Sequence, residues 1–207
     1  MEKLVLLLAF TLTVVGAIAQ PDYEKNMYKA FQLWEEGNPD EASALFERIA
    51  TVETDAWLPN YYVALVNTTT AFESKDEKRV NALLTKAQTA LDVELAKHPN
   101  NAELLVVQAM IHTAWIAFDP MTNGQKLSPV VSSIYAKAEK IAPQNPRVVF
   151  SKAQFALGSA QYFGTDTSSI CSEIEKSLEL FDTFKPESDL HPNWGKEFAQ
   201  GTLASCK

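Results

Sequence analysis

Four alanines at recurring intervals are the feature of this 207-residue chain that most limits its fold. Each lies in a helical segment with one apolar face, at the place where two helices would cross. They are Ala30, Ala64, Ala109 and Ala153, and 34, 45 and 44 residues separate them. Periods of this length are typical of units of two helices joined by a turn, which bury their apolar faces only by stacking. The spacing therefore predicts an all-α solenoid of about four helical hairpins.

The first hairpin has the clearest local signals. Gly37-Asn38 ends its first helix, because glycine accepts the left-handed conformation that a helix terminus often needs. Pro39 then begins the second helix, at a position where its missing N–H costs no hydrogen bond. Ala42 and Phe46 follow at helical spacing, on the face that we expect to be buried.

This hairpin resembles the tetratricopeptide repeat family. The family pattern has a small residue in the first helix, a Gly-Asn or Gly-Asp turn, and Ala-x3-aromatic in the second helix. Ala30, Gly37-Asn38 and Ala42-x3-Phe46 supply these features. The resemblance implies a right-handed α-α superhelix, in which the first helix of each hairpin lines the concave face. The later hairpins match the pattern more loosely, so an irregular helical bundle without true repeats is the alternative.

Apolar stripes and proline junctions predict the later helices. We expect helices at residues 57–72, 77–97, 130–141, 147–163 and 167–184 and from Ala102 onward, with a last amphipathic helix at 193–205. A loop is expected at 119–129. The last helix would cover the exposed apolar end of the stack, as the solubility of a solenoid requires.

The two cysteines are predicted to form a disulfide that holds this capping helix. If the last two helices are antiparallel about a turn near 188–189, Cys171 and Cys206 are equidistant from that turn and lie at the same end. Closing a loop of 35 residues would stabilise the fold by roughly 4 kcal/mol in the chain-entropy model. Two free thiols are the alternative.

The N-terminal residues 1–19 predict a cleavable export signal. Lys3 precedes an apolar run at 4–15, and small residues form a cleavage site that ends at Ala19. The run would extend roughly 18 Å as a helix, too short for a hydrocarbon core of about 30 Å. An uncleaved anchor is the alternative. We therefore expect a periplasmic or secreted protein with one tetratricopeptide-like domain at 20–207, and its leader resembles those of exported Bacteroidetes proteins.

Charge and motifs argue against several function classes. The net charge of −8 disfavours nucleic acid and anionic lipid surfaces, which need clustered Lys and Arg. His98 and His191 occupy equivalent His-Pro-Asn junctions, which indicates a role in turns, and His112 lacks a His or Cys three or four residues away. We predict a non-catalytic protein without a metal or cofactor site.

The first hypothesis for function is an exported scaffold that binds a protein or peptide segment in an envelope assembly. The resemblance implies that the first helices line a mostly apolar and aromatic groove, and such side chains anchor interfaces. The expected partner-binding residues are Met27, Phe31, Trp34, Tyr61, Leu65, Val106, Met110, Phe150 and Gln154. Family members that bind a chaperone's C-terminal carboxylate use Lys, Asn and Arg, so that ligand is not expected on this apolar surface.

The second hypothesis is a protein that binds a small molecule or lipid. The capping helix and the 119–129 loop would close a pocket lined by Trp34, Tyr61, Trp115 and Phe150.

Overall fold

The computed structural model describes residues 19–206, which form nine α-helices and no strand. In chain order the helices are α1 (Ala19–Glu35), α2 (Pro39–Val52), α3 (Leu58–Glu73), α4 (Glu77–Lys97), α5 (Ala102–Phe118), α6 (Pro120–Ile141), α7 (Pro146–Phe163), α8 (Ser168–Thr183) and α9 (Lys196–Ala204). The predicted export signal lies outside the described residues except for Ala19, where α1 begins.

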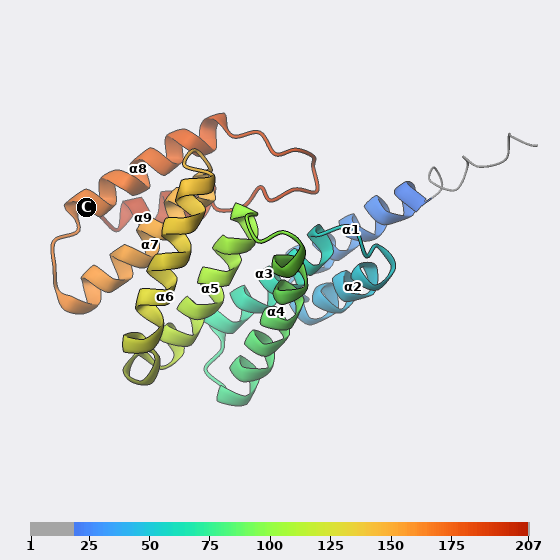
Figure 1. Cartoon of the computed structure of the whole chain (residues 1–207), viewed down its shortest axis with the longest axis horizontal. Coiled ribbons are helices and arrows are strands. Elements are labelled where there is room, and N and C mark those ends of the chain that lie inside the picture. Colours follow the sequence, from blue (N-terminus) through green and yellow to red (C-terminus); the bar gives the residue numbers. More distant parts are fainter. Residues whose placement is uncertain (1–18, 207) are drawn as a thin grey trace, which may run out of the picture.

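The helices pair as consecutive antiparallel hairpins laid side by side, from α1–α2 to α7–α8 (Figure 1). The first helices α3, α5 and α7 also pack on one another in succession. The buried apolar residues form a series of neighbouring clusters along the stack, rather than one cluster about a central axis. This arrangement is the all-α, solenoid-like fold that the alanine spacing predicts.

Helix termini follow the local signals of the sequence. Gly37 has φ 81° between α1 and α2, which is the left-handed conformation expected there. The side chains of Asp76, Asn101 and Asn145 accept hydrogen bonds from backbone N–H groups of the first turns of α4, α5 and α7. These caps satisfy donors that a helix cannot satisfy by itself.

Helix α5 is the centre of the stack. Its first eight residues, 102–109, are all buried, because α3, α4, α6 and α7 surround it. The sequence of α5 is apolar on every side, which is typical of a helix without a solvent face.

The loop predicted at 119–129 is wrong, because residues 120–129 belong to α6 and Asp119 caps its start. The Asp119 side chain accepts a hydrogen bond from Thr122 N at 3.1 Å, and Pro120 occupies the first helical position. Pro129 lies inside the helix, where it removes one backbone hydrogen bond. The helix continues past Pro129 because Val131, and Tyr135 one turn after Val131, are buried.

Helix α9 closes the end of the stack as predicted. Its Ala199 is fully buried with Phe150 of α7 and Ile174 of α8. A disulfide joins Cys171 of α8 to Cys206, with Cα atoms 6.0 Å apart, so the predicted pairing is confirmed. The helix begins at Lys196 rather than at residue 193.

Candidate functional site

The segment between α8 and α9, residues 184–195, is called the strap here. It leaves the end of the stack, reaches back to α3 and returns to α9 (Figure 1). The Tyr62 hydroxyl donates to the Leu190 carbonyl oxygen at 2.8 Å, and Trp194 Nε1 donates to the Tyr61 hydroxyl at 2.8 Å. Leu190 is buried in the same core cluster as both tyrosines. The strap is therefore a packed part of the fold.

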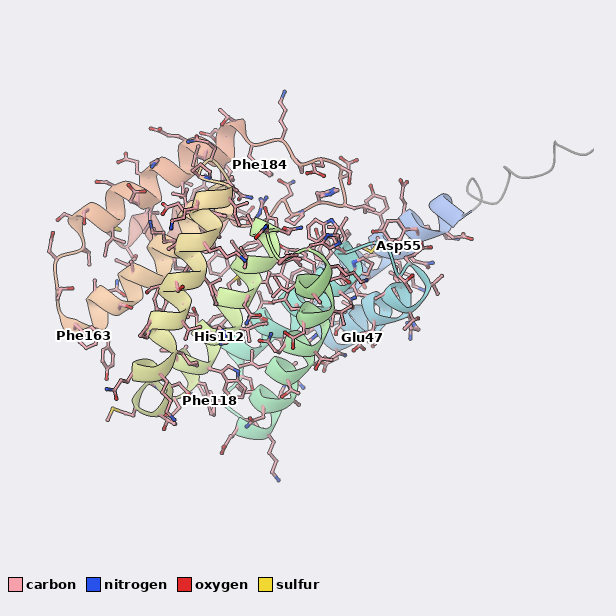
Figure 2. The ribbon with its side chains drawn as sticks, viewed as in Figure 1. Glu47, Asp55, His112, Phe118, Phe163 and Phe184 are labelled. Carbon is pink, nitrogen blue, oxygen red and sulfur yellow. A yellow bond between two sulfur atoms is a disulfide. The ribbon has the colours of Figure 1, made fainter. Side chains whose placement is uncertain are left out.

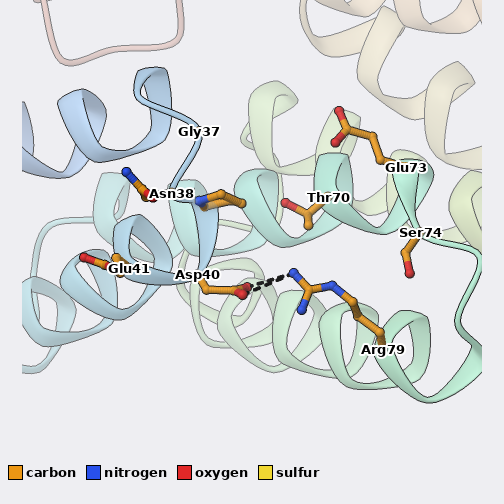
Figure 3. Close-up of a pocket in the computed structure, with 9 residues that line it drawn as sticks. Gly37, Asn38, Asp40, Glu41, Thr70, Glu73, Ser74 and Arg79 are labelled. Carbon is orange, nitrogen blue, oxygen red and sulfur yellow. Dashed lines mark hydrogen bonds and ion pairs between the residues drawn. The ribbon is translucent and has the colours of Figure 1, made fainter.

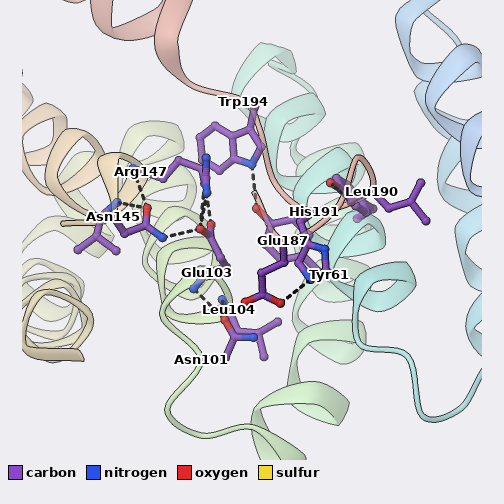
Figure 4. A network of polar contacts seen from close by, with 12 residues as sticks. Tyr61, Asn101, Glu103, Leu104, Asn145, Arg147, Glu187, Leu190, His191 and Trp194 are labelled. Carbon is purple, nitrogen blue, oxygen red and sulfur yellow. Dashed lines mark hydrogen bonds and ion pairs between the residues drawn. The ribbon is translucent and has the colours of Figure 1, made fainter. Parts of the chain in front are cut away.

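A buried ion pair lies next to the strap, at the N-terminal ends of α5 and α7 (Figure 4). Arg147 Nε donates to both carboxylate oxygens of Glu103, at 3.0 and 2.8 Å, and Arg147 Nη2 donates to Oε1 at 2.6 Å. Asn145 Nδ2 donates to the same oxygen at 2.6 Å. On the strap side, the centroid of the Phe184 ring lies 4.5 Å from Arg147 Cζ, which is a cation–π contact.

The electrostatics of this network keep Arg147 charged and Tyr61 protonated. Burial lowers the pKa of Arg147, but the hydrogen bonds and the charge of Glu103 raise it by more, so the guanidinium stays charged. Burial raises the pKa of Tyr61 well above 10, and the charge of Glu103 adds to this effect. The Tyr61 hydroxyl therefore keeps its proton.

One atom of the network lacks a partner. Arg147 Nη1 is buried and makes no hydrogen bond to any residue that the structure describes. A buried donor in this state is costly, because it has lost its hydrogen bonds to water.

A cleft of about 660 Å³ opens between the strap and the α4–α5 and α6–α7 junctions. Its wall consists of Trp57 and of residues from the α4–α5 junction, the α6–α7 junction and the strap. The volume lies within the range of about 300–1,000 Å³ that is usual for small-molecule sites. Aromatic, aliphatic and proline side chains form much of this wall. They are Trp57, Pro99, Ala102, Ile141, Ala142, Phe184, Pro186 and Pro192.

Both junction histidines line this cleft. The His191 ring is held on three sides: Ser188 Oγ lies 2.8 Å from Nδ1, Glu187 Oε2 lies 3.2 Å from Nε2, and the Trp57 ring centroid is 5.7 Å away. The side chain of His98 is exposed. The two His-Pro-Asn junctions, which the sequence indicates as turns, therefore also contribute to one surface.

A second cavity of about 470 Å³ lies between the start of α2 and the α3–α4 turn (Figure 3). Its wall is polar, and Arg79 Nη2 forms an exposed ion pair with Asp40 Oδ2 at 3.1 Å. An exposed pair of this kind contributes about 0–1 kcal/mol. This cavity offers no apolar surface comparable to that of the strap cleft.

The predicted partner-binding residues divide by burial. Five are buried in the core: Met27, Tyr61, Leu65, Val106 and Phe150. Phe31, Trp34 and Met110 are half-buried against the core, and Gln154 is exposed. None of the nine residues belongs to the wall of the strap cleft. The spacing of apolar residues along each helix identified its apolar face. It did not show whether that face packs against other helices or remains open to a partner.

The pocket of the second hypothesis is not formed as predicted. Tyr61 and Phe150 are buried in different clusters, and Trp34 and Trp115 pack against the first of these. None of these four residues belongs to the wall of either cavity described above. The loop that was predicted to close the pocket, residues 119–129, is instead the N-cap and first part of α6. Neither the strap nor Arg147 was among the site residues predicted from the sequence. The only sequence signal for this surface was the repeated His-Pro-Asn junction.

His112 is half-buried on α5 (Figure 2), and its Nε2 lies 3.0 Å from Gln108 Nε2. Burial lowers the pKa of His112 from 6.5. Within residues 19–206, no group of three or more His, Cys, Asp and Glu side chains is placed to hold a metal ion. No helix in this part of the chain is long and apolar enough to cross a membrane.

Comparison with known proteins identifies the fold. No protein-family profile matches the chain, and no curated sequence matches it. One similar structure is the HusA haemophore from Porphyromonas gingivalis, with a TM-score of 0.70 and 24% identity, covering 89% of this chain and 92% of that one. Another is a thermophilic TPR protein from Thermus thermophilus, with a TM-score of 0.62 and 17% identity, covering 89% of each chain. The chain therefore has the tetratricopeptide-like helical fold that its first hairpin predicts.

Proposed function

We propose that this chain is an exported, non-catalytic binding protein that holds a small apolar molecule in the strap cleft. The observation that carries the proposal is the cleft itself, about 660 Å³ in volume, with Trp57 and Phe184 in its wall. Apolar surface combined with polar groups that fix a ligand's orientation is the usual form of a small-molecule site. This proposal keeps the ligand class of the second sequence hypothesis but moves its site to the strap.

A flat, apolar ring system suits this wall. Aromatic and proline side chains offer flat apolar surfaces, and burying apolar surface contributes about 25 cal/mol per Å². Because one structural neighbour is described as a haemophore, haem and its metal-free porphyrin are the first ligands to test.

Export is supported by two independent features. The Cys171–Cys206 disulfide is of a kind that persists in oxidising compartments. The N-terminal sequence has the apolar run and small-residue cleavage site of an export signal.

The test is an equilibrium titration of the oxidised mature chain with haemin and with metal-free protoporphyrin, followed by absorbance and by tryptophan fluorescence. Trp57→Ala removes one aromatic wall of the cleft. Trp34→Ala is the matched control, because Trp34 is also half-buried against the first core cluster but does not line the cleft. We expect saturable binding that Trp57→Ala weakens at least tenfold and Trp34→Ala leaves unchanged. Equal effects of the two substitutions, or no saturable binding, would contradict the proposal.

A protein or peptide partner on the concave face is the second candidate. It is favoured by Phe31, Trp34 and Met110, which are half-buried rather than sealed in the core, and by the fold shared with a TPR protein. Crosslinking in cell envelopes tests it with Phe31→Glu. A partner recovered by the natural chain and lost with this variant would support the second candidate, and recovery by both would count against it.

A further inference from the structure

We propose that the ligand of the strap cleft is an acid, and that Arg147 and Lys185 bind its carboxylate. This inference rests on the proposed function and names the chemistry of the ligand. It comes from the hydrogen bonds and charges around the cleft.

The first step concerns the hydrogen bonds of Arg147. Both carboxylate oxygens of Glu103 already accept hydrogen bonds, which come from Arg147 Nε, Arg147 Nη2 and Asn145 Nδ2. Arg147 Nη1 is left without a partner among the described residues, although the Arg147 side chain is only 1% exposed and lines the cleft. A carboxylate is the strongest acceptor for a guanidinium N–H. An acidic ligand would offer Arg147 Nη1 the acceptor that the described residues do not supply.

The second step concerns the other charges of the cleft. Lys185 is exposed on the strap and forms no ion pair within the part of the chain that the structure describes. Of the two acids in the wall, Glu103 is paired with Arg147, and the Glu187 side chain is 87% exposed, so water screens its charge. The wall therefore holds two cations and two carboxylates, so its formal charges balance, and within the described residues Lys185 is the cation that no carboxylate pairs with.

Helix dipoles do not reverse this balance. The positive ends of α5 and α7 face the cleft, and the negative ends of α4 and α6 meet them at the same two junctions. Because these partial charges largely offset one another, the side chains determine where in the cleft a carboxylate would bind.

The apolar and charged parts of the wall together describe the ligand. Trp57 and Phe184 suit a flat apolar body, whereas Arg147 and Lys185 suit one or more carboxylates at its edge. Protoporphyrin IX has this combination, with an apolar macrocycle and two carboxylates.

The test changes the ligand, because replacing buried Arg147 would leave Glu103 unpaired and endanger folding. Binding of protoporphyrin IX is compared with binding of its dimethyl ester, which keeps the macrocycle and removes both negative charges. We expect the ester to bind about ten- to hundredfold more weakly, the range for losing hydrogen bonds to a charged group. Lys185→Gln should weaken binding of the free acid roughly two- to fivefold and leave binding of the ester unchanged.

The control variant is Lys126→Gln, an exposed lysine on α6 outside the cleft wall, and it should alter neither affinity. Equal binding of acid and ester would overturn the assignment of a carboxylate, while the small-molecule proposal would stand. Failure of both compounds to bind would instead overturn the proposal that the cleft holds this kind of ring. If Lys185→Gln weakened acid and ester alike, its role would be structural and the inference would be wrong.

Discussion

The Cys171–Cys206 disulfide is predicted to hold both the capping helix and the strap. Helix α9 has nine residues, and an isolated helix of fewer than about 12–15 residues is marginal in water. Its only buried side chain is Ala199. The bridge encloses residues 172–205, which include the whole strap, so its loss would remove the covalent constraint on the strap and α9 together.

The expected effect follows from the length of the closed loop. The two cysteines are 35 residues apart, and the chain-entropy relation gives about 4 kcal/mol for a loop of that length. For a chain of this size, each 1 kcal/mol shifts the Tm by about 2–4 °C. The Cys171→Ser/Cys206→Ser double variant should therefore lose about 4 kcal/mol of unfolding free energy and melt roughly 8–16 °C lower.

Urea unfolding and thermal melting of the double variant measure this loss. The matched control is Ser172→Ala/Ser205→Ala, which changes the exposed neighbour of each cysteine and leaves the bridge intact. Reduction of the natural chain should reproduce the behaviour of the cysteine variant. If the cysteine variant and the control unfolded at the same urea concentration, the bridge would not stabilise the fold and the reasoning would be refuted.

Three further substitutions test the fold at the strap and along α5. Glu103→Ala should cost about 3–5 kcal/mol in urea unfolding, because it leaves buried Arg147 unpaired; a loss below about 1 kcal/mol would contradict the buried ion pair. Gly195→Ala should cost about 1–3 kcal/mol, because Gly195 has φ 111° and an added Cβ would lie 2.8 Å from Phe181 Cζ; an unchanged Tm would exclude this strap geometry. Burial lowers the pKa of His112 below 6.5, so the unfolded chain binds the proton more readily and stability falls as the pH drops below that value. His112→Gln should flatten that decline in unfolding free energy between about pH 7 and pH 5, and an unaltered pH profile would show that His112 is not its source.

Local signals in the sequence predicted most of the helices. The helix predicted at 77–97 has the same bounds as α4, because Asp76 caps its start and the His-Pro-Asn junction ends it. The disulfide followed from the antiparallel register of α8 and α9. The segment 119–129 was misjudged because Pro129 and Gly124 argue against a helix locally, whereas the Asp119 cap and the buried face further along α6 outweigh them.

The candidate site was harder to predict because long-range contacts create it. Tyr62 and Leu190 are 128 residues apart, and no helical or strand period marks the strap. The pairing of Arg147 with Glu103 joins the starts of two helices that only the stacking of hairpins brings together. Tyr61 was expected to line an open groove, but the strap and the core cover it completely.

Amide hydrogen exchange with and without protoporphyrin IX tests the location of the binding site most directly. We predict slower exchange in the strap, residues 184–195, and in the two junctions at 98–103 and 141–147 once the ligand is bound, with no change in the α1–α2 hairpin. Protection confined to the α1–α2 hairpin, or no change in the strap under saturating ligand, would contradict the claim that the strap cleft is the binding site.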